Sequence, residues 1–122
     1  MNVFERTLSI LQNNAEPLWE ESNLRQIHTN LPVLIFVSVG QHQGTKIKHS
    51  ARIKVQNNYS SNYDFDNFTI TVNQLKVVGE VKIKSNDVEL VKQWIVLNRD
   101  ALNDLWNDKI DSFDFMKTMK SL

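Results

Sequence analysis

A strict alternation of apolar and polar side chains over residues 45–56 constrains the fold more than any other feature of this chain. Every second residue is apolar or histidine, in the series Ile47, His49, Ala51, Ile53 and Val55. The residues between them are polar and mostly basic: Lys46, Lys48, Ser50, Arg52 and Lys54. Because successive side chains of a strand point to opposite faces of a sheet, the pattern predicts a strand with one buried face and one basic face.

Three further segments carry strand patterns. Residues 31–39 form a continuous apolar run rich in β-branched side chains, which is typical of a strand buried on both faces. A polar turn bracketed by glycines follows this run and predicts a hairpin with the 45–56 strand. Residues 68–72 alternate apolar side chains with threonine, and residues 75–84 end by alternating apolar side chains with lysine. We expect Gly79 to mark a bulge in the last of these strands.

Helical patterns flank the strands. Near the N-terminus, the spacing of apolar residues predicts a helix over residues 3–12, and Pro17 opens a second short helix that includes Leu24 and Ile27. After the strands, Asn86 and Glu89 have capping-box spacing and predict a long helix over residues 87–107, whose apolar face includes Val91 and Ile95. A last helix is expected to begin at Asp111 or Ser112.

Asn98 falls in the middle of the apolar face predicted for the long helix. A buried asparagine needs hydrogen-bond partners. Two interpretations stay open: the side chain fixes a register or an oligomeric state, or it bonds to the backbone of a loop.

The order of two helices, four strands and two helices indicates an α+β fold, in which an antiparallel sheet of three to four strands is flanked by N-terminal and C-terminal helices. The length of 122 residues is typical of one domain. We therefore expect a single domain over 1–122, with a helical N-terminal segment (1–30), an antiparallel sheet (31–84) and a helical C-terminal segment (85–122).

Composition excludes several classes of protein. The chain has no cysteine, so neither a disulfide framework nor a thiolate metal site can form. Its apolar runs are much shorter than the about 20 residues that a membrane-spanning helix needs. The N-terminus lacks the basic-then-apolar pattern of a signal peptide. We expect a cytoplasmic protein that does not associate with a membrane.

No catalytic or cofactor-binding signature is present. The three histidines, His28, His42 and His49, have no partners at metal-ligand spacing. Asp64 and Asp66 resemble a sparse metal loop, but the series of oxygen ligands and the glycine of a calcium loop are missing. The sequence therefore predicts a protein that is not an enzyme and holds neither a metal ion nor a cofactor.

Charge is segregated along the chain although the formal net charge is zero. Residues 45–84 carry a balance of +4, whereas residues 1–44 and 85–122 each carry −2. Such segregation indicates surfaces that meet charged partners.

A basic strand face is the first candidate binding surface. Its cations lie on the 45–56 strand and on the predicted 75–84 strand: Lys46, Lys48, Arg52, Lys54, Lys82 and Lys84. Three aromatic residues follow in a polar loop and have rings that can stack on bases: Tyr59, Tyr63 and Phe65. The alternative is a solvated sheet face whose lysines prevent edge-to-edge aggregation.

An acidic stripe is the second candidate. Its members recur every three or four residues: Asp100, Asp104, Asp108 and Asp111. Like charges at this spacing destabilise a helix slightly, which favours a role in docking against a basic protein groove. The alternative is a solvated helix face.

Two stretches of sequence are similar to known proteins. They are GTK and KHSARIKVQN at 44–46 and 48–57, and WIVLNR, LWN and ID at 94–99, 105–107 and 110–111. Together they resemble uncharacterised small proteins of Bacteroidetes and their prophages. The tail alone resembles a domain-of-unknown-function family that is often encoded beside toxin–antitoxin genes. The resemblance implies a small cytosolic accessory protein from a mobile-element or defence setting.

Two functional hypotheses follow. The first is a non-catalytic protein that docks on a larger bacterial protein, such as a nucleic-acid-guided nuclease or a toxin, and blocks or neutralises it, as an anti-CRISPR inhibitor or an antitoxin does. The second is a module that binds RNA or single-stranded nucleic acid with the basic strand face. A homodimer is compatible with either.

Overall fold

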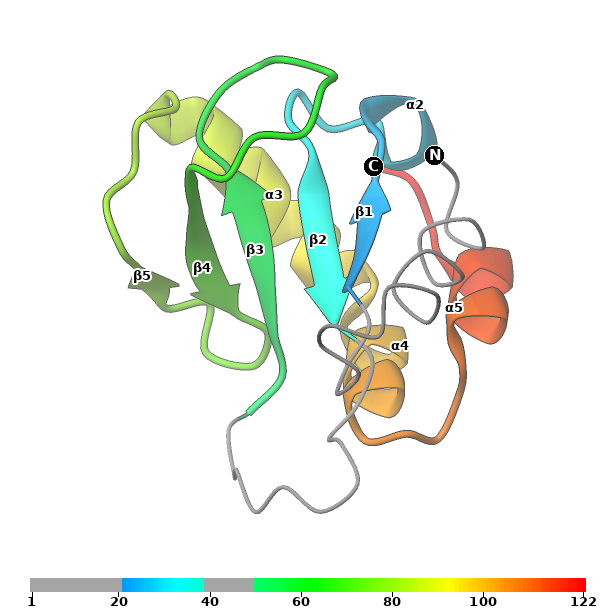
Figure 1. Cartoon of the computed structure of the whole chain (residues 1–122). Coiled ribbons are helices and arrows are strands. Elements are labelled where there is room, and N and C mark those ends of the chain that lie inside the picture. The colour runs from blue at the N-terminus through cyan, green and yellow to red at the C-terminus, as the bar shows by residue number, and fades with distance from the viewer. Residues whose placement is uncertain (1–20, 39–49) are drawn as a thin grey trace.

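The computed structural model describes residues 21–38 and 50–122, and these stretches contain five strands and four helices (Figure 1). In chain order the elements are β1 (Glu21–Leu24), α2 (Gln26–Thr29), β2 (Ile35–Ser38), β3 (Arg52–Gln56), β4 (Asn67–Thr71), β5 (Val77–Val78), α3 (Ser85–Leu97), α4 (Arg99–Trp106) and α5 (Ser112–Thr118). The strands form one antiparallel sheet in the order β1-β2-β3-β4-β5, so each strand pairs with its neighbours in the sequence. The predicted α+β class with an antiparallel sheet is confirmed.

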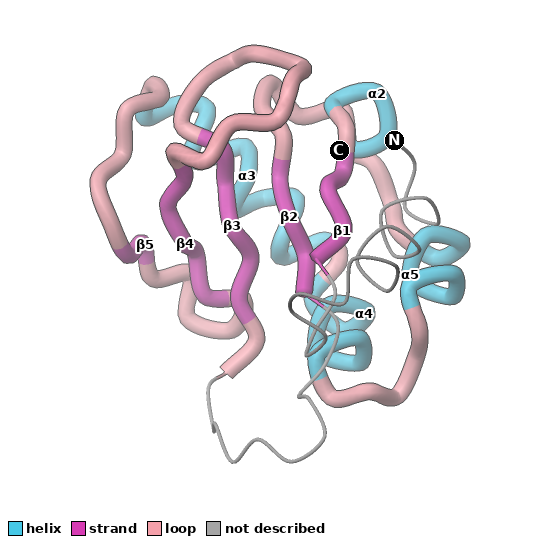
Figure 2. The backbone as a smooth tube through the Cα atoms, viewed as in Figure 1, coloured by secondary structure: helices cyan, strands magenta, loops and turns pink. Residues whose placement is uncertain are grey.

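The helices α3 and α4 lie across one face of the sheet, and α5 lies beyond the β1 edge (Figure 2). The core between sheet and helices contains alternate side chains of the strands, such as Ile53 and Val55 of β3. From the helices it contains Val91 and Ile95, which confirms the predicted apolar face.

The alternation that predicts β3 holds over its described part. Ala51, Ile53 and Val55 are buried in the core, whereas Arg52 and Lys54 are half-buried on the outer face of the sheet. Residues 46–49, which carry the first half of the pattern, lie outside the described residues. The first predicted helix, over residues 3–12, lies outside them too.

The second predicted helix is wrong over residues 21–24, which form the edge strand β1. β1 pairs with β2, and Leu24 stands opposite Ile35 and is fully buried. Pairing satisfies the backbone of this segment and buries Leu24, whereas Ile27, which a common helix face would also bury, is 78% exposed. Within the described part of this predicted helix, residues 21–30, the single turn α2 is helical, and Asn30 ends it with a left-handed φ of 64°.

The predicted 75–84 strand is wrong in extent, because β5 contains only Val77 and Val78. Gly79 follows with a φ of +105°, a conformation that glycine adopts easily, and it ends the pairing rather than forming a bulge within a longer strand. The backbone beyond it bonds to a side chain instead of a strand: the Asn57 amide donates to the Glu80 carbonyl at 2.8 Å and accepts from the Lys82 N–H at 2.8 Å.

The predicted 87–107 helix is two helices, α3 and α4, separated at Asn98. Its predicted capping box is wrong as well, because Asn86 already lies in the first turn and Lys84 is the N-cap residue. The predicted start of the last helix is confirmed. The Asp111 carboxylate accepts the Asp114 N–H at 2.8 Å, and the Asp114 carboxylate accepts the Asp111 N–H at 3.3 Å.

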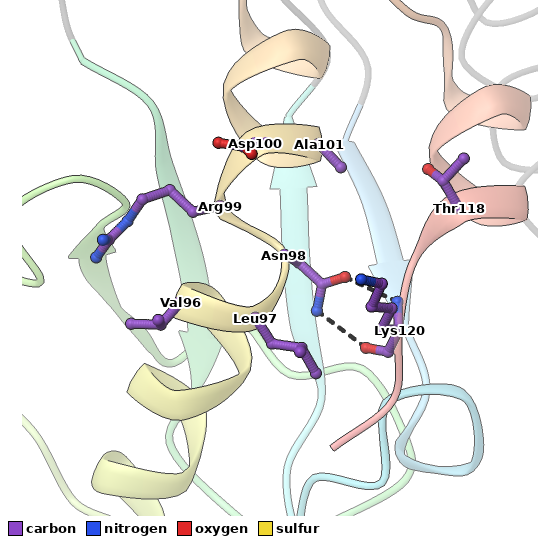
Figure 3. A pocket seen from close by; sticks show the side chains of 8 residues that line it. All are labelled: Val96, Leu97, Asn98, Arg99, Asp100, Ala101, Thr118 and Lys120. Atoms are coloured by element: carbon purple, nitrogen blue, oxygen red, sulfur yellow. Dashed lines mark hydrogen bonds between the residues drawn. The ribbon is translucent and has the colours of Figure 1, made fainter.

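Asn98 fixes the segment that follows α5 against the α3–α4 junction (Figure 3). Its side chain is buried and donates to the carbonyls of Trp94, at 3.0 Å, and Lys120, at 2.9 Å. It also accepts the Lys120 N–H at 2.7 Å. Of the two interpretations of this asparagine, a hydrogen bond to loop backbone is the one observed. Further along, the Leu122 N–H donates to the Thr29 carbonyl at 2.8 Å, so the same segment also reaches α2.

Replacing the buried Asn98 with alanine is expected to lower the free energy of unfolding by about 2 kcal/mol, because it leaves the part-buried N–H and carbonyl of Lys120 without their partner. Urea denaturation gives the stability, and amide hydrogen exchange at Lys120 reports whether the segment is released. The matched control is Asn103→Ala, which removes an exposed side-chain pair with Asn73 and should cost about 0.5 kcal/mol or less. Equal stabilities of the two variants, with a still protected Lys120 amide, would contradict this role for Asn98.

Candidate functional site

The loop between β3 and β4, residues 57–66, carries most of the exposed aromatic side chains of the described region, and we call it the aromatic loop. It curls over the end of the sheet beside α2 and the start of α3 (Figure 1). It contains no regular secondary structure, so side chains must satisfy much of its backbone. Two consecutive amide residues at the end of β3 do this.

Gln56 organises the interior of the aromatic loop. It is fully buried, and its Nε2 lies 2.9 Å from the Asn58 Oδ1, 3.3 Å from the Ser60 carbonyl and 3.0 Å from the Asn62 carbonyl. Its Oε1 accepts the Asp64 N–H at 2.9 Å. One side chain thus contacts every second residue from Asn58 to Asp64, and these contacts fix the path of the loop around it.

Asn57 fixes the base of the loop. Besides its bonds to the segment after β5, its Nδ2 donates to the Asp66 Oδ1 at 3.0 Å. The other Asp66 oxygen lies 2.6 Å from the Lys82 ammonium. Asp66 therefore accepts a hydrogen bond from the Asn57 amide and pairs with the Lys82 ammonium. The aromatic loop and the segment after β5 are joined at the surface by these contacts.

The stretch around Asp64 and Asp66 resembles a sparse metal loop in sequence. In the structure it surrounds the side-chain amide of Gln56. The backbone carbonyls of Ser60 and Asn62, which a cation would need as ligands, accept from the Gln56 Nε2 instead. Within residues 21–38 and 50–122, no group of three or more histidine, cysteine, aspartate or glutamate side chains is placed to hold a metal ion. The Gln56 amide therefore holds the interior of this loop.

A chain of aromatic contacts leads from the sheet to solvent. Phe36 lies in β2 on the face opposite the core and is buried. The Tyr63 ring contacts it edge-on, with centroids 5.4 Å apart, and Phe65 contacts Tyr63 in the same way at 5.1 Å. Tyr63 is 43% exposed and Phe65 is 84% exposed. The loop therefore supports one aromatic ring on another and leaves the last one almost fully in water.

Tyr59 holds the aromatic loop through its hydroxyl, while its side chain is 45% exposed. Its hydroxyl donates to the Asp87 carboxylate at 2.6 Å and accepts the Lys84 N–H at 2.9 Å. The hydrogen bond to Asp87 raises the pKa of the Tyr59 hydroxyl above its ordinary value. Tyr59 thus fastens the aromatic loop to the first turn of α3.

A second exposed apolar side chain lies next to the loop. The Gln26 Nε2 of α2 donates to the Ser60 carbonyl at 3.3 Å, so α2 borders the aromatic loop. Its neighbour Ile27 is 78% exposed. We call the aromatic loop together with α2 the aromatic end of the molecule, and its exposed apolar side chains include Ile27, Tyr63 and Phe65. Sequence reasoning missed Ile27, because it placed this residue on a buried helix face.

The predicted basic strand face is not assembled as expected. Arg52 and Lys54 share the outer face of β3, where Lys54 stands opposite Phe36 of β2. Lys82 and Lys84 lie in the segment between β5 and α3 rather than on a strand, and Lys82 is paired with Asp66. The remaining two cations, Lys46 and Lys48, lie outside the described residues.

The predicted acidic stripe is broken by the end of α4. Asp100 and Asp104 lie on α4, whereas Asp108 follows this helix with a left-handed φ of 64°. Asp111 caps α5, and the hydrogen bond that it accepts from the Asp114 backbone lowers the pKa of its carboxyl. The four carboxylates therefore do not share one helix face, and one of them serves the fold.

A cleft of about 300 Å³ lies between the α3–α4 junction and the segment after α5 (Figure 3). It is lined by Val96, Leu97, Asn98, Arg99, Asp100, Ala101, Thr118 and Lys120. Three polar side chains of this cleft are engaged in the fold: the Asn98 amide bonds to Lys120, the Arg99 Nε donates to the Val72 carbonyl at 3.1 Å, and the Thr118 hydroxyl donates to the Asp114 carbonyl at 3.0 Å. Because these three side chains hold the fold together, the cleft is not the best candidate site.

None of the helices in the described part of the chain is both long and apolar enough to span a bilayer.

Comparisons with known proteins add no relative. No protein-family model matches the chain, and no curated protein or solved structure matches it either. The resemblance to small Bacteroidetes and prophage proteins therefore stays a prediction, and the function must be argued from the residues themselves.

The attachment of the aromatic loop is expected to weaken in acid. The Lys82 ammonium and then the Asn57 amide hold the pKa of the Asp66 carboxyl below its ordinary value of 3.8. Because this pKa is lower in the folded chain than in the unfolded chain, the pair stabilises the loop above about pH 4 and is lost as the pH falls through the folded value. Carboxyl carbon NMR shifts measure this titration directly. A midpoint for Asp66 at or above 3.8 would contradict the attachment.

Proposed function

We propose that this chain is a small, non-catalytic binding protein that docks on a larger bacterial protein through the aromatic end and blocks or neutralises it. The observation that carries this proposal is a well-bonded loop that holds Phe65 84% exposed. Burying a phenylalanine stabilises a protein by about 1.5–3 kcal/mol, so an exposed ring on a fixed loop forgoes that gain unless a partner covers it. Aromatic side chains also supply much of the binding energy at protein interfaces.

The construction of the loop favours binding in a second way. Gln56 and Asn57 fix the loop before any partner arrives, and Tyr59 fastens it to α3. A loop that is already ordered loses less conformational entropy when it binds, so more of the contact energy appears as affinity. This argument applies to the aromatic loop and not to the cleft, where the bonded groups hold the fold together.

The charges around Phe65 favour a protein partner over a nucleic acid. Phe65 lies between Asp64 and Asp66, whose carboxylates repel phosphate. Lys82, the cation beside them, is already paired with Asp66. An RNA-binding role would depend on Arg52 and Lys54 of the outer sheet face, and both of these side chains are half-buried.

The setting we propose for this activity is the bacterial cytoplasm. The lack of cysteine suits a reducing compartment. The resemblance of the 48–57 and 94–99 segments to prophage proteins supports a target in a defence or toxin system, such as a nucleic-acid-guided nuclease. We propose the family setting by analogy and the docking surface from its residues.

Replacing Phe65 with serine is expected to reduce partner binding at least about tenfold without changing stability, because the ring contacts solvent in the free protein. The measurement is a pull-down with the tagged protein from nuclease-treated Bacteroidetes lysate. Phe113→Ser is the matched control, since Phe113 is 60% exposed on α5, away from the loop. A stoichiometric partner should be retained by the wild type and by Phe113→Ser and lost by Phe65→Ser. Equal capture by all three proteins would count against the proposal.

A further inference from the structure

The charges at and beside the aromatic end balance. The aromatic loop and the segment 80–87 that bonds to it carry four carboxylates and two ammonium groups. Lys54, which stands opposite Phe36 in the β2–β3 pair, and Arg25, which precedes α2, supply two more cations, so four charges of each sign are present. The charged groups are Asp64, Asp66, Glu80, Asp87, Lys82, Lys84, Lys54 and Arg25. Because neither sign is in excess, this end does not select its partner by charge.

The polar groups on either side of Phe65 already have partners within the protein. Each of the four carboxylate oxygens of Asp64 and Asp66 accepts a hydrogen bond, at 2.6–3.2 Å. The donors are the side-chain amides of Asn58 and Asn57, the Asp66 N–H and the Lys82 ammonium. The Phe65 carbonyl accepts from the Asn67 amide at 3.0 Å. A partner that covers this part of the loop therefore does not have to supply hydrogen bonds to it, which lowers the cost of removing water.

The Phe65 side chain stands out from the aromatic loop. It is 84% exposed, and Tyr63 supports it edge-on with ring centroids 5.1 Å apart. A flat partner surface covers a side chain of this kind on one side, whereas a pocket encloses it on several sides. Enclosed, fully desolvated anchors supply most of the binding energy at protein interfaces. The exposed ring and the satisfied polar groups at its base therefore fit an apolar pocket that admits one phenyl ring.

We propose that the partner protein presents an uncharged, apolar pocket that takes up the Phe65 ring and leaves Asp64 and Asp66 at the rim of the contact. This inference rests on the proposed function and specifies the chemistry of its partner. The cleft beside the α3–α4 junction of a second copy does not suit the ring, because five of the eight residues that line it are polar or charged. We therefore place the pocket on a different protein. Binding of this kind should be insensitive to salt, since salt screens charges and not apolar contacts.

The first test uses β-cyclodextrin, a closed ring of sugars whose apolar cavity admits one phenyl ring, as a defined probe. Backbone NMR shifts are recorded while the full chain is titrated with β-cyclodextrin and with the open chain of the same sugars. Cyclodextrin should shift the amides of residues 64–66 in the wild type and in Phe113→Ser but not in Phe65→Ser, and the open chain should shift none of them. No shift of these amides by cyclodextrin, or equal shifts by the open chain, would overturn the inference.

The second test adds one polar group and keeps the shape of the ring. Phe65→Tyr adds a hydroxyl that an apolar pocket leaves without a hydrogen-bond partner, so capture of the lysate partner should weaken about tenfold. Phe113→Tyr makes the same change on α5 and should leave capture unchanged. The wild type should capture the partner equally at about 0.1 M and about 1 M sodium chloride. Full capture by Phe65→Tyr, or loss of the wild-type complex at high salt, would overturn the inference.

The two proposals fail differently. If the lysate partner is lost by Phe65→Ser but captured fully by Phe65→Tyr, the docking surface stands and the apolar pocket is wrong. If Phe65→Ser captures the partner fully, the docking surface itself is wrong. A dimer of this chain in sedimentation that Phe65→Ser abolishes would place the pocket on a second copy and overturn the choice of partner.

Discussion

Val91→Asp should unfold the protein. Val91 lies in the middle of α3, is fully buried and belongs to the core that joins the sheet to the helices. Aspartate at this position would place a carboxylate among apolar side chains without a partner, and such changes cost about 4 kcal/mol or more. The total stability of a domain of this size is about 5–15 kcal/mol, so the folded population should fall sharply. Far-UV circular dichroism and urea denaturation measure the loss.

Two variants make this test specific. Ile95→Asp, one turn further along the same buried face, should have the same effect. Gln93→Asp adds the same charge on the exposed side of α3 and should change stability by about 0.5 kcal/mol or less. A cooperatively folded Val91→Asp protein with an unchanged urea midpoint would mean that the core does not lie where the structure has it.

Gln56→Leu should disorder the aromatic loop while it leaves the sheet intact. The new side chain has similar size but leaves the Asp64 N–H, the Asn62 carbonyl and the Asn58 side chain without their Gln56 partner. We expect a loss of about 2–4 kcal/mol in stability, since these groups must find water instead. Binding should fall as well, although Phe65 is still present, because the ring is no longer held in place.

Amide hydrogen exchange at Asp64 measures the loop, and partner capture measures the function. The matched control is Gln74→Leu, at an exposed position in the turn between β4 and β5. It makes the same chemical change and should alter neither readout. A Gln56→Leu protein with a protected Asp64 amide and full partner capture would show that the loop does not depend on the buried amide.

The parts of the fold that sequence predicts well are those decided by local periodicity. The alternation around Ile53 and Val55 gives β3 and its buried face, and the helical spacing of Val91 and Ile95 gives the core face of α3. In both cases burial alone determines the pattern, so the pattern can be read without knowing the rest of the structure.

The parts of the fold that sequence does not predict are determined by hydrogen bonds between segments far apart in the chain. Whether residues 80–84 form a strand depends on the Asn57 side chain, which takes the backbone groups that a neighbouring strand would otherwise bond. The break at Asn98 depends on the Lys120 backbone, 22 residues away. Residues 21–24 become a strand because β2 offers an edge, which outweighs a weak local preference for helix.

In the candidate site too, some features follow from the local sequence and others depend on bonds between distant segments. The run of asparagine, serine and aspartate between Gln56 and Asn67 correctly indicates an exposed loop with aromatic rings. The pairing of Lys82 with Asp66, 16 residues apart, turns an expected basic contact into an internal tie. The bond from Tyr59 to Asp87, 28 residues apart, makes this tyrosine an anchor of the loop, which its sequence position does not indicate. Only the structure shows that Phe65 and Ile27 are the most exposed apolar side chains of the aromatic end, at 84% and 78%.

The most direct test of the docking surface is photo-crosslinking in the bacterial host with benzoylphenylalanine in place of Phe65, and in place of Phe113 as control. The account predicts a covalent protein adduct of one defined mass from position 65 and none from position 113. No protein adduct from position 65, or the same adducts from both positions, would contradict it.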